Sequence, residues 1–382
     1  MDFEYTDEQK LLRREIIAFA RRELNAGAEE RDRAGEFSRT LFGLCGEMGL
    51  TGLPVPEEYG GVGQDPLTTA LALEAFGYGC EDGGLVFSVC AHLLACVVPV
   101  WKHGSEELKE RYLPELARGA RIAVNGMSEP GSGSDAFAMT TRAVPDGDGF
   151  RISGTKTFAS NGPVADLALI YAVTDPSRGY YGGVTAFLVE TSAPGFRVGQ
   201  RFEKMGLRSS PISELVLEDV VVPRGAVVGE VGGGAGVFTE SMEWERICIA
   251  AVHVGTMQRL LERAVTQART RTAFGQAIGK FQAVSHRIVD MKIRLEAARL
   301  MTYRAASKLG RARSLALESS MTKVLVSESL VASALDALQV FGGYGYMVEY
   351  GIERVLRDSV GSTLYSGTSE IQKNIIAGWL GL

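Results

Sequence analysis

One stretch of the chain reads Ser241-Met242-Glu243-Trp244-Glu245-Arg246-Ile247-Cys248-Ile249-Ala250-Ala251. Its apolar residues recur at helical spacing, and the pattern continues to Met257. On such a helix Glu245 is flanked at three and four residues by Met242, Cys248 and Ile249, so a carboxylate lies on the face that packs into the core. Burying an unpaired charge costs free energy. A carboxylate at such a position therefore forms an ion pair, lies at the edge of the apolar face, or has a catalytic role. The sequence pattern of this helix alone favours a structural role for Glu245.

The size and composition are those of an ordinary globular protein. The 382 residues suffice for two or three domains or one large one, with 46% hydrophobic and 23% charged residues. A net charge of −6 argues against a nucleic-acid partner. The four histidines form no metal-ligand pattern with cysteines or carboxylates, so no metal is expected.

Cysteine usage and the N-terminus predict a cytoplasmic protein. The five cysteines include no CxxC pair and lie among apolar residues, which is typical of reduced, buried thiols. The acidic N-terminus lacks the plan of a signal peptide. Residues 83–101 are apolar enough for a membrane span, but His92 and Pro99 favour a buried core helix and no membrane partner.

The pattern of apolar residues changes twice along the chain. Residues 1–122 have helical periodicity and residues 123–231 have short strand-like runs between turns, whereas residues 232–382 are helical again. No amphipathic helix separates the strands, which excludes βαβ units. The sequence predicts an α+β protein with an N-terminal all-α domain (1–122), a central β-sandwich or barrel (123–231) and a C-terminal four-helix bundle (232–382).

Glycine clusters at residues 131–134, 232–236 and 342–345 lack the context of a phosphate-binding loop. None follows a strand and opens a helix, and none continues into Gly-Lys-Ser/Thr, so a dinucleotide fold and a nucleotide hydrolase are disfavoured. Residues 127–135 nevertheless offer backbone N–H groups and three hydroxyls, and residues 157–162 add an aromatic face. This combination suits a flat heteroaromatic cofactor.

Five motifs occur in one order along the chain: residues 127–135 (MSEPGSGSD), 154–161 (GTKTFASN), 204–208 (KMGLR), 271–275 (RTAFG) and 339–345 (QVFGGYG). In order and spacing they resemble the acyl-CoA dehydrogenase family over essentially the whole chain. The resemblance implies the three domains above, one FAD per subunit, and a homotetramer or homodimer whose FAD sites are shared between subunits.

The resemblance also assigns residues to the cofactor. Met127 and Ser128 are expected near the pyrimidine end of the flavin, and Ser134 near its phosphates or the substrate tail. Phe158, where many relatives have tryptophan, stacks on the isoalloxazine, and Ser160 lies near its N5 and O4 positions. Four residues are expected to hold the adenosine diphosphate half of an FAD in the neighbouring subunit: Arg271, Phe274, Gln339 and Gly343. Thr368 and Gln372 are expected to complete the site.

The chain departs from the family where most members carry the catalytic base. Their Tyr-Glu-Gly-Thr stretch is Tyr365-Ser366-Gly367-Thr368 here, and an unassisted hydroxyl is too weak to remove the α-proton of a thioester. A subset resembling isovaleryl- and long-chain acyl-CoA dehydrogenases carries the base at the position of Glu245, ahead of Arg246. Glu245 is therefore the expected catalytic residue. The expected substrate-binding residues are Ser134, Arg246, Tyr365, Ser366 and Gly367.

The resemblance implies a mechanism. The thioester carbonyl accepts a hydrogen bond from the backbone N–H of residue 366, and Glu245 takes the α-proton while the β-hydrogen leaves as hydride. A free glutamate has a pKa of about 4.3, which desolvation should raise. Glu243 is expected to pair with Arg246 at i,i+3, and Glu370 to be solvated or to cap a helix.

Residues 242–246 and 366–369 are most similar to a branch of secondary metabolism that oxidises acyl or prolyl groups on carrier proteins. Such carriers are acidic, so a basic surface is expected, with candidates Arg13, Arg14, Arg21 and Arg22. Tyr365 and residues 83–95 are expected to shape the acyl pocket.

Three alternatives stay open from the sequence. One is a dehydrogenase of free short or branched acyl-CoA, and a second is a flavin-dependent monooxygenase on the same fold. The third is a thioester-binding protein without activity. The electron acceptor, an electron-transfer flavoprotein or oxygen, is undecided.

Overall fold

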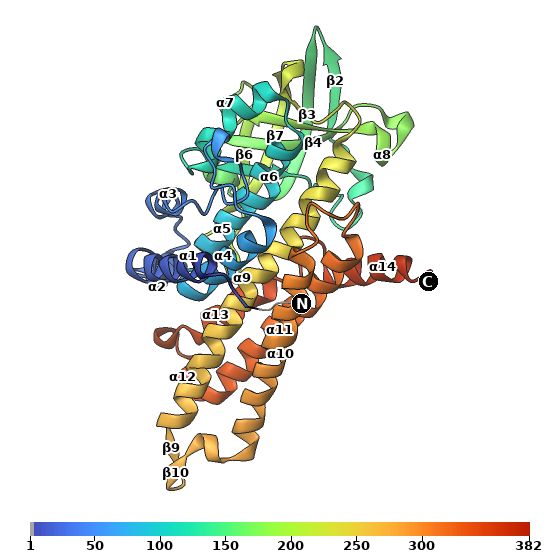
Figure 1. The fold of residues 1–382 in the computed structure, drawn as a ribbon. Coiled ribbons are helices and arrows are strands. Elements are labelled where there is room, and N and C mark those ends of the chain that lie inside the picture. Colours follow the sequence, from blue (N-terminus) through green and yellow to red (C-terminus); the bar gives the residue numbers. More distant parts are fainter. Residues whose placement is uncertain (1–3) are drawn as a thin grey trace.

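The computed structural model describes residues 4–382, and Figure 1 shows a sheet at one end of the molecule and long helices at the other. The N-terminal helices are α1 (Asp7–Phe19), α2 (Ala28–Ala34), α3 (Arg39–Glu47), α4 (Pro66–Gly79), α5 (Gly83–His92), α6 (Val98–His103) and α7 (Glu106–Ala117). Their starts follow from side-chain caps. Thr6 and Gln9 form a reciprocal capping box, and Asp65 caps α4 with Pro66 at its first position.

The apolar run near residue 90 is a core helix. The segment Gly83–His103 has a mean hydropathy of 2.1 over an 18-residue window, and 83% of that window is buried inside the protein. A second segment of membrane-spanning length, Ala316–Phe341, has a mean hydropathy of 1.5 and is half buried. Length and apolar composition are weak evidence for a membrane span, because core helices share both properties.

The strands form one sheet of eight, in the order β6-β7-β3-β2-β4-β5-β8, with β1 parallel to β4. They are β1 (Ala123–Gly126), β2 (Arg142–Asp146), β3 (Gly149–Ser160), β4 (Leu167–Val173), β5 (Val184–Glu190), β6 (Phe196–Arg201), β7 (Ile212–Val222) and β8 (Val227–Val228). The pairing of β3 with β7 shifts register between Lys156 and Ala159. Such a bulge re-aims the side chains within it, here Thr157 and Phe158.

The C-terminal helices are α9 (Gly234–Thr270), α10 (Gln282–Ala306), α11 (Ala316–Phe341), α12 (Gly343–Tyr346), α13 (Ile352–Gly361) and α14 (Ser369–Trp379). Of these, α9, α10 and α11 pack against one another and run side by side away from the sheet (Figure 1). The order of helices, sheet and helices confirms the α+β class predicted from the sequence.

Helix α9 joins two hydrophobic cores. Its first half, with Trp244 and Cys248, packs with α4, α5 and the sheet. Its second half, with Val254 and Leu260, packs against α10 and α11. Glu245 therefore lies where the helical domain, the sheet and the bundle meet.

Candidate active site

The carboxylate of Glu245 points into the protein, as the apolar spacing around it predicts. The residue is 8% exposed, and its Oε1 accepts a hydrogen bond from Ser366 Oγ. Burial raises the pKa of Glu245, while the Ser366 hydrogen bond and the neighbouring Arg246 charge oppose that rise.

The surroundings of the other buried carboxylates set Glu245 apart. Among residues 4–382 five acidic side chains are buried, and three of them form ion pairs: Glu74 with Arg299, Asp82 with Arg31, and Glu129 with Lys156. Glu243 accepts hydrogen bonds from the Leu315 N–H at 2.7 Å and Ser314 Oγ at 3.1 Å. Within the described part of the chain, the Glu245 carboxylate has a serine hydroxyl as its one hydrogen-bond partner, which is how a carboxylate that transfers protons would be held.

The expected pair between Glu243 and Arg246 was wrong. Glu243 instead accepts the Leu315 N–H at the start of α11, where a free backbone donor needs a partner. Arg246 instead contacts the turn before α14, where its Nε donates to the carbonyl oxygen of Ser366 at 3.0 Å. The sequence could not show this, because both partners lie more than 70 residues away in the chain.

The turn that carries Ser366 is held from several sides. Ser366 has φ of 57° and Gly367 has φ of 89°, a left-handed conformation that costs on the order of 1–3 kcal/mol for a residue other than glycine. Gln372 Nε2 donates to the carbonyls of Ser366 and Gly367 at 3.1 and 3.2 Å, and Thr368 caps α14. These contacts fix the Ser366 hydroxyl on Glu245.

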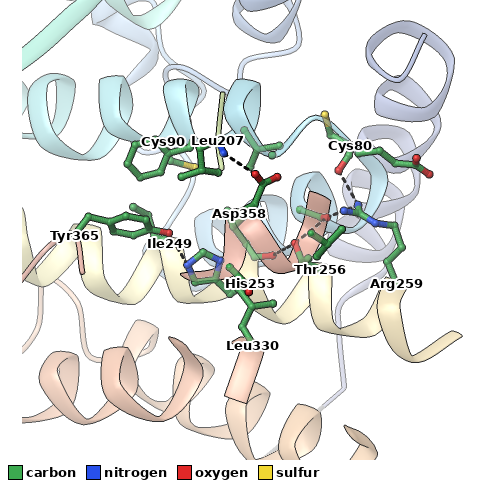
Figure 2. Close-up of a pocket in the computed structure, with 18 residues that line it drawn as sticks. Cys80, Cys90, Leu207, Ile249, His253, Thr256, Arg259, Leu330, Asp358 and Tyr365 are labelled. Carbon is green, nitrogen blue, oxygen red and sulfur yellow. Dashed lines mark hydrogen bonds between the residues drawn. The ribbon is translucent and has the colours of Figure 1, made fainter. Parts of the chain in front are cut away.

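Tyr365 forms one wall of a cavity beside this turn (Figure 2). Its hydroxyl lies 2.9 Å from Nε2 of His253, and its ring centroid lies 4.7 Å from that of Phe87. The cavity has a volume of about 50 Å³ and is also lined by Cys90 and Ile249. His253 was missed in the sequence, although its position eight residues after Glu245 on the same helix is a usable signal.

A buried ion pair supports the loop that contains Met127 and Ser128. Lys156 Nζ lies 2.8 Å from Glu129 Oε1 and donates to the Met127 carbonyl at 3.2 Å. The Thr157 N–H donates to the Ser128 carbonyl at 2.8 Å. Although burial opposes ionisation, Lys156 and the hydrogen bonds hold the pKa of Glu129 well below its usual range.

The residues expected at the flavin leave a face open beside that loop. Phe158 is 63% exposed at φ of 53°, although a bulky side chain rarely adopts this conformation, and its ring lies 5.5 Å from that of Phe202. Ser160, at the end of β3, is half-buried, and Ser134 is exposed. No heavy atom lies within 4 Å of where a Cβ would stand on Gly131 or Gly133. An exposed ring on an unusual backbone conformation, beside open backbone, fits the flat cofactor that the residues predict.

The second set of expected cofactor residues lies at the opposite end of α9. Arg271, the residue that directly follows that helix, comes 26 positions after Glu245, which is about 39 Å at 1.5 Å per residue. Phe274 is 95% exposed at φ of 50°, and Gln339 and Gly343 are exposed at the end of α11 and the start of α12. One subunit therefore does not bring these residues to Glu245. Gln372, by contrast, is fully buried, and its Oε1 has no hydrogen-bond partner.

The four arginines expected to form a basic surface are already engaged. Arg14 and Arg22 form ion pairs with Glu15 and Glu23. The two others, Arg13 and Arg21, lie 5.6 and 5.2 Å from the centroid of the Tyr78 ring. Two of the four charges are therefore paired with neighbouring carboxylates, and the other two lie against an aromatic ring.

Comparisons with known proteins cover the chain almost end to end. Family models described as the N-terminal, middle and C-terminal domains of acyl-CoA dehydrogenase match residues 6–120, 125–220 and 232–381. An L-prolyl-[peptidyl-carrier protein] dehydrogenase of Pseudomonas fluorescens is 44% identical over 99% of both chains. A crystal structure of the prolyl acyl carrier protein oxidase AnaB superposes with a TM-score of 0.97 at 44% identity, covering 99% of this chain and all of the other. A structure of PigA with FAD and proline also has a TM-score of 0.97, at 42% identity over all of both chains.

Proposed function

Since the chain belongs to the acyl-CoA dehydrogenase family, we propose that it oxidises a short acyl thioester tethered to a carrier protein, with Glu245 as the catalytic base. It is an FAD-dependent oxidoreductase. The observation that supports the role of Glu245 is that it is a buried carboxylate that forms no ion pair within residues 4–382 and contacts Ser366, the residue at the family's usual base position.

Proton removal follows from the surroundings of Glu245. Burial raises the pKa of its carboxylate toward the operating pH, which is the condition for an efficient general base. The bound flavin supplies a hydride acceptor for the β-carbon. The protein's part is to hold the α-carbon against Glu245 and to keep water from that carboxylate.

The backbone N–H of Ser366 supports the binding of the thioester carbonyl. Within residues 4–382 it donates to no protein acceptor, whereas the Ser366 carbonyl is bound by Arg246 and Gln372. A free donor at a rigid turn beside the base is suited to an oxygen that gains negative charge during α-proton loss. Arg246 and Gly367 act here by fixing the turn, and Tyr365 by bounding the acyl group.

A prolyl group on a carrier protein is the substrate that we favour. Two similar proteins are described as acting on prolyl carrier proteins, and the PigA structure contains proline. A small cavity of about 50 Å³, bounded by Tyr365 beside the turn that contacts Glu245, supports a compact acyl group. Free acyl-CoA is the second candidate, because an acyl-CoA dehydrogenase of Bacillus subtilis is 38% identical over 98% of both chains.

The same proposal includes a shared cofactor site. The distance of about 39 Å along α9 supports a second subunit as the place where Arg271, Phe274, Gln339 and Gly343 meet the FAD. Exposed Val289, Ile293 and Leu300 on α10 add apolar surface suited to contact between subunits. Because all five cysteines are free and buried, we propose a cytoplasmic location, where thiols stay reduced.

Anaerobic mixing of the yellow holoenzyme with thioesters tests this proposal. The panel contains prolyl-carrier protein, prolyl-pantetheine, isobutyryl-CoA and butyryl-CoA, and the readout is bleaching of the flavin absorbance. We expect the prolyl-carrier thioester to bleach the flavin fastest. Faster bleaching by the CoA thioesters would favour the second candidate, and bleaching by none of the four would refute dehydrogenation of a short acyl thioester.

A further inference from the structure

The cavity that Tyr365 bounds follows one face of α9. Residues from this helix that line it are Ile249, Val252, His253, Thr256 and Arg259. Their spacing of one, three and four residues places them on a common side of the helix. Ile249 lies one turn beyond Glu245 on α9, and Tyr365 directly precedes the serine that donates to the Glu245 carboxylate, so the cavity lies about one helical turn from that carboxylate. An acyl group with its α-carbon at Glu245 and its chain directed along α9 would extend toward this cavity.

Tyr365 stands across this cavity and is held at two points. Its hydroxyl meets His253 Nε2 at 2.9 Å, and its ring packs on Phe87 of α5 with a centroid distance of 4.7 Å. In Figure 2 the Tyr365 ring lies along one side of the cavity, and its hydroxyl is directed at the imidazole of His253. The hydrogen bond is the only polar contact of the Tyr365 side chain within the described residues.

The contact joins two neutral groups. Burial lowers the pKa of His253 to about 3, with the charge of Lys323 acting in the same direction, and burial raises the pKa of Tyr365 well above its usual value. Across the neutral range the pair therefore keeps one O–H and one ring N–H to share. The hydrogen bond between His253 and Tyr365 therefore fixes the orientation of the Tyr365 ring.

The position of that ring limits the size of the acyl group. The cavity behind the ring has a volume of about 50 Å³, which is small for a ligand pocket. We propose that His253 is a positioning residue that fastens Tyr365 across the acyl cavity and thereby restricts the enzyme to compact acyl groups. This inference rests on the proposed function, and it deepens that function by assigning its size selection to a pair of residues outside the cofactor site.

Three variants of the holoenzyme test the role of the pair. His253→Ala removes the partner of Tyr365, Tyr365→Phe keeps the ring and removes the hydroxyl, and His253→Gln keeps a hydrogen-bonding side chain. The first readout is the ratio of flavin reduction rates with isobutyryl- and hexanoyl-pantetheine. The second is the Kd of hexanoyl-pantetheine, followed by the flavin spectrum in a Glu245→Gln background. Thermal melting identifies a variant that does not fold.

We expect His253→Ala to lower the preference for the compact acyl group about tenfold, as pocket changes of this size do, and to tighten hexanoyl binding. Tyr365→Phe should act in the same direction to a smaller extent, and His253→Gln should stay within about threefold of the wild type, a difference of less than 1 kcal/mol. An unchanged ratio and Kd in both His253→Ala and Tyr365→Phe would overturn the proposal. If no thioester reduces the wild-type flavin, the proposed function fails, and the Kd values still decide whether the pair selects by size.

Discussion

The hydroxyl of Ser366 donates a hydrogen bond to the carboxylate of Glu245, across 121 positions of the chain. Ser366 stands where most members of the family carry their base, and Glu245 lies on a bundle helix. The two positions converge on one point of the site, so a carboxylate from either one reaches the same space. In this chain position 245 carries the carboxylate, and position 366 carries a hydroxyl whose hydrogen bond orients that carboxylate.

Removing that hydroxyl should shift the pH dependence of flavin reduction. The Ser366 hydrogen bond favours the charged form of Glu245, so Ser366→Ala raises the pKa of the carboxylate further. Because the base must be deprotonated, the ascending limb of the rate against pH moves to higher pH. Ser362→Ala is the control, since Ser362 Oγ donates to the Ser359 carbonyl and does not touch Glu245. An unshifted limb in Ser366→Ala would contradict the assignment of the limb to Glu245.

A carboxylate moved to the other position should restore part of the activity. We expect the double variant Glu245→Gln/Ser366→Glu to reduce its flavin at least about tenfold faster than Glu245→Gln alone. The side chain of residue 366 already points toward residue 245, so a glutamate there places a carboxylate close to the position of the original one. Stopped-flow absorbance under anaerobic conditions measures both rates. Equal rates in the two variants would show that the positions are not equivalent for proton removal.

Gly367 should tolerate no side chain. Its φ is 89°, and an added Cβ would lie 2.4 Å from Nε2 of Gln372, the side chain that fixes the turn. We expect Gly367→Ala to cost about 1–3 kcal/mol in the free energy of unfolding and to slow flavin reduction. Gly378→Ala is the matched control, because nothing lies within 4 Å of its Cβ position and it lies in a helix. Urea unfolding of both variants is the measurement, and equal loss in the two would argue against strain at Gly367.

The ion pair of Glu129 and Lys156 should dominate acid sensitivity near the flavin site. The folded-state pKa of Glu129 is depressed, so its contribution to stability is present above the ordinary carboxyl value of 4.5 and is lost as the pH falls toward about 2. Glu129→Gln leaves Lys156 buried without its partner and should destabilise the fold at pH 7 by about 3–5 kcal/mol. The exposed pair of Glu218 with Arg197 supplies the control, since Glu218→Gln should change stability by less than about 1 kcal/mol. Chemical unfolding at pH 7 and pH 4 compares them, and a similar loss in both variants would count against the burial argument.

Much of the fold was predictable from local sequence. Thr6 with Gln9, and Asp65 with Pro66, begin helices through contacts within four residues, and the apolar spacing around Glu245 correctly placed it on the buried face. Local rules suffice there because the interacting groups lie within one helical turn.

The contacts that complete the site join residues far apart in the chain. Glu243 meets Leu315 rather than Arg246, and His253 meets Tyr365. The positive φ of Phe158, Phe274 and Ser366 likewise depends on tertiary packing, because none of these residue types favours it. Spacing along the sequence carries no record of such pairs, which is why resemblance supplied the site roles and the structure supplied their geometry.

The most direct test of the account is the rate of anaerobic flavin reduction by a prolyl-carrier thioester in Glu245→Gln compared with the wild type. The account predicts that the variant keeps its FAD and its fold and reduces the flavin about 10²–10⁴-fold more slowly, the range over which general bases contribute. A Glu245→Gln enzyme that reduces its flavin within a few-fold of the wild-type rate would contradict the role of Glu245 as the base.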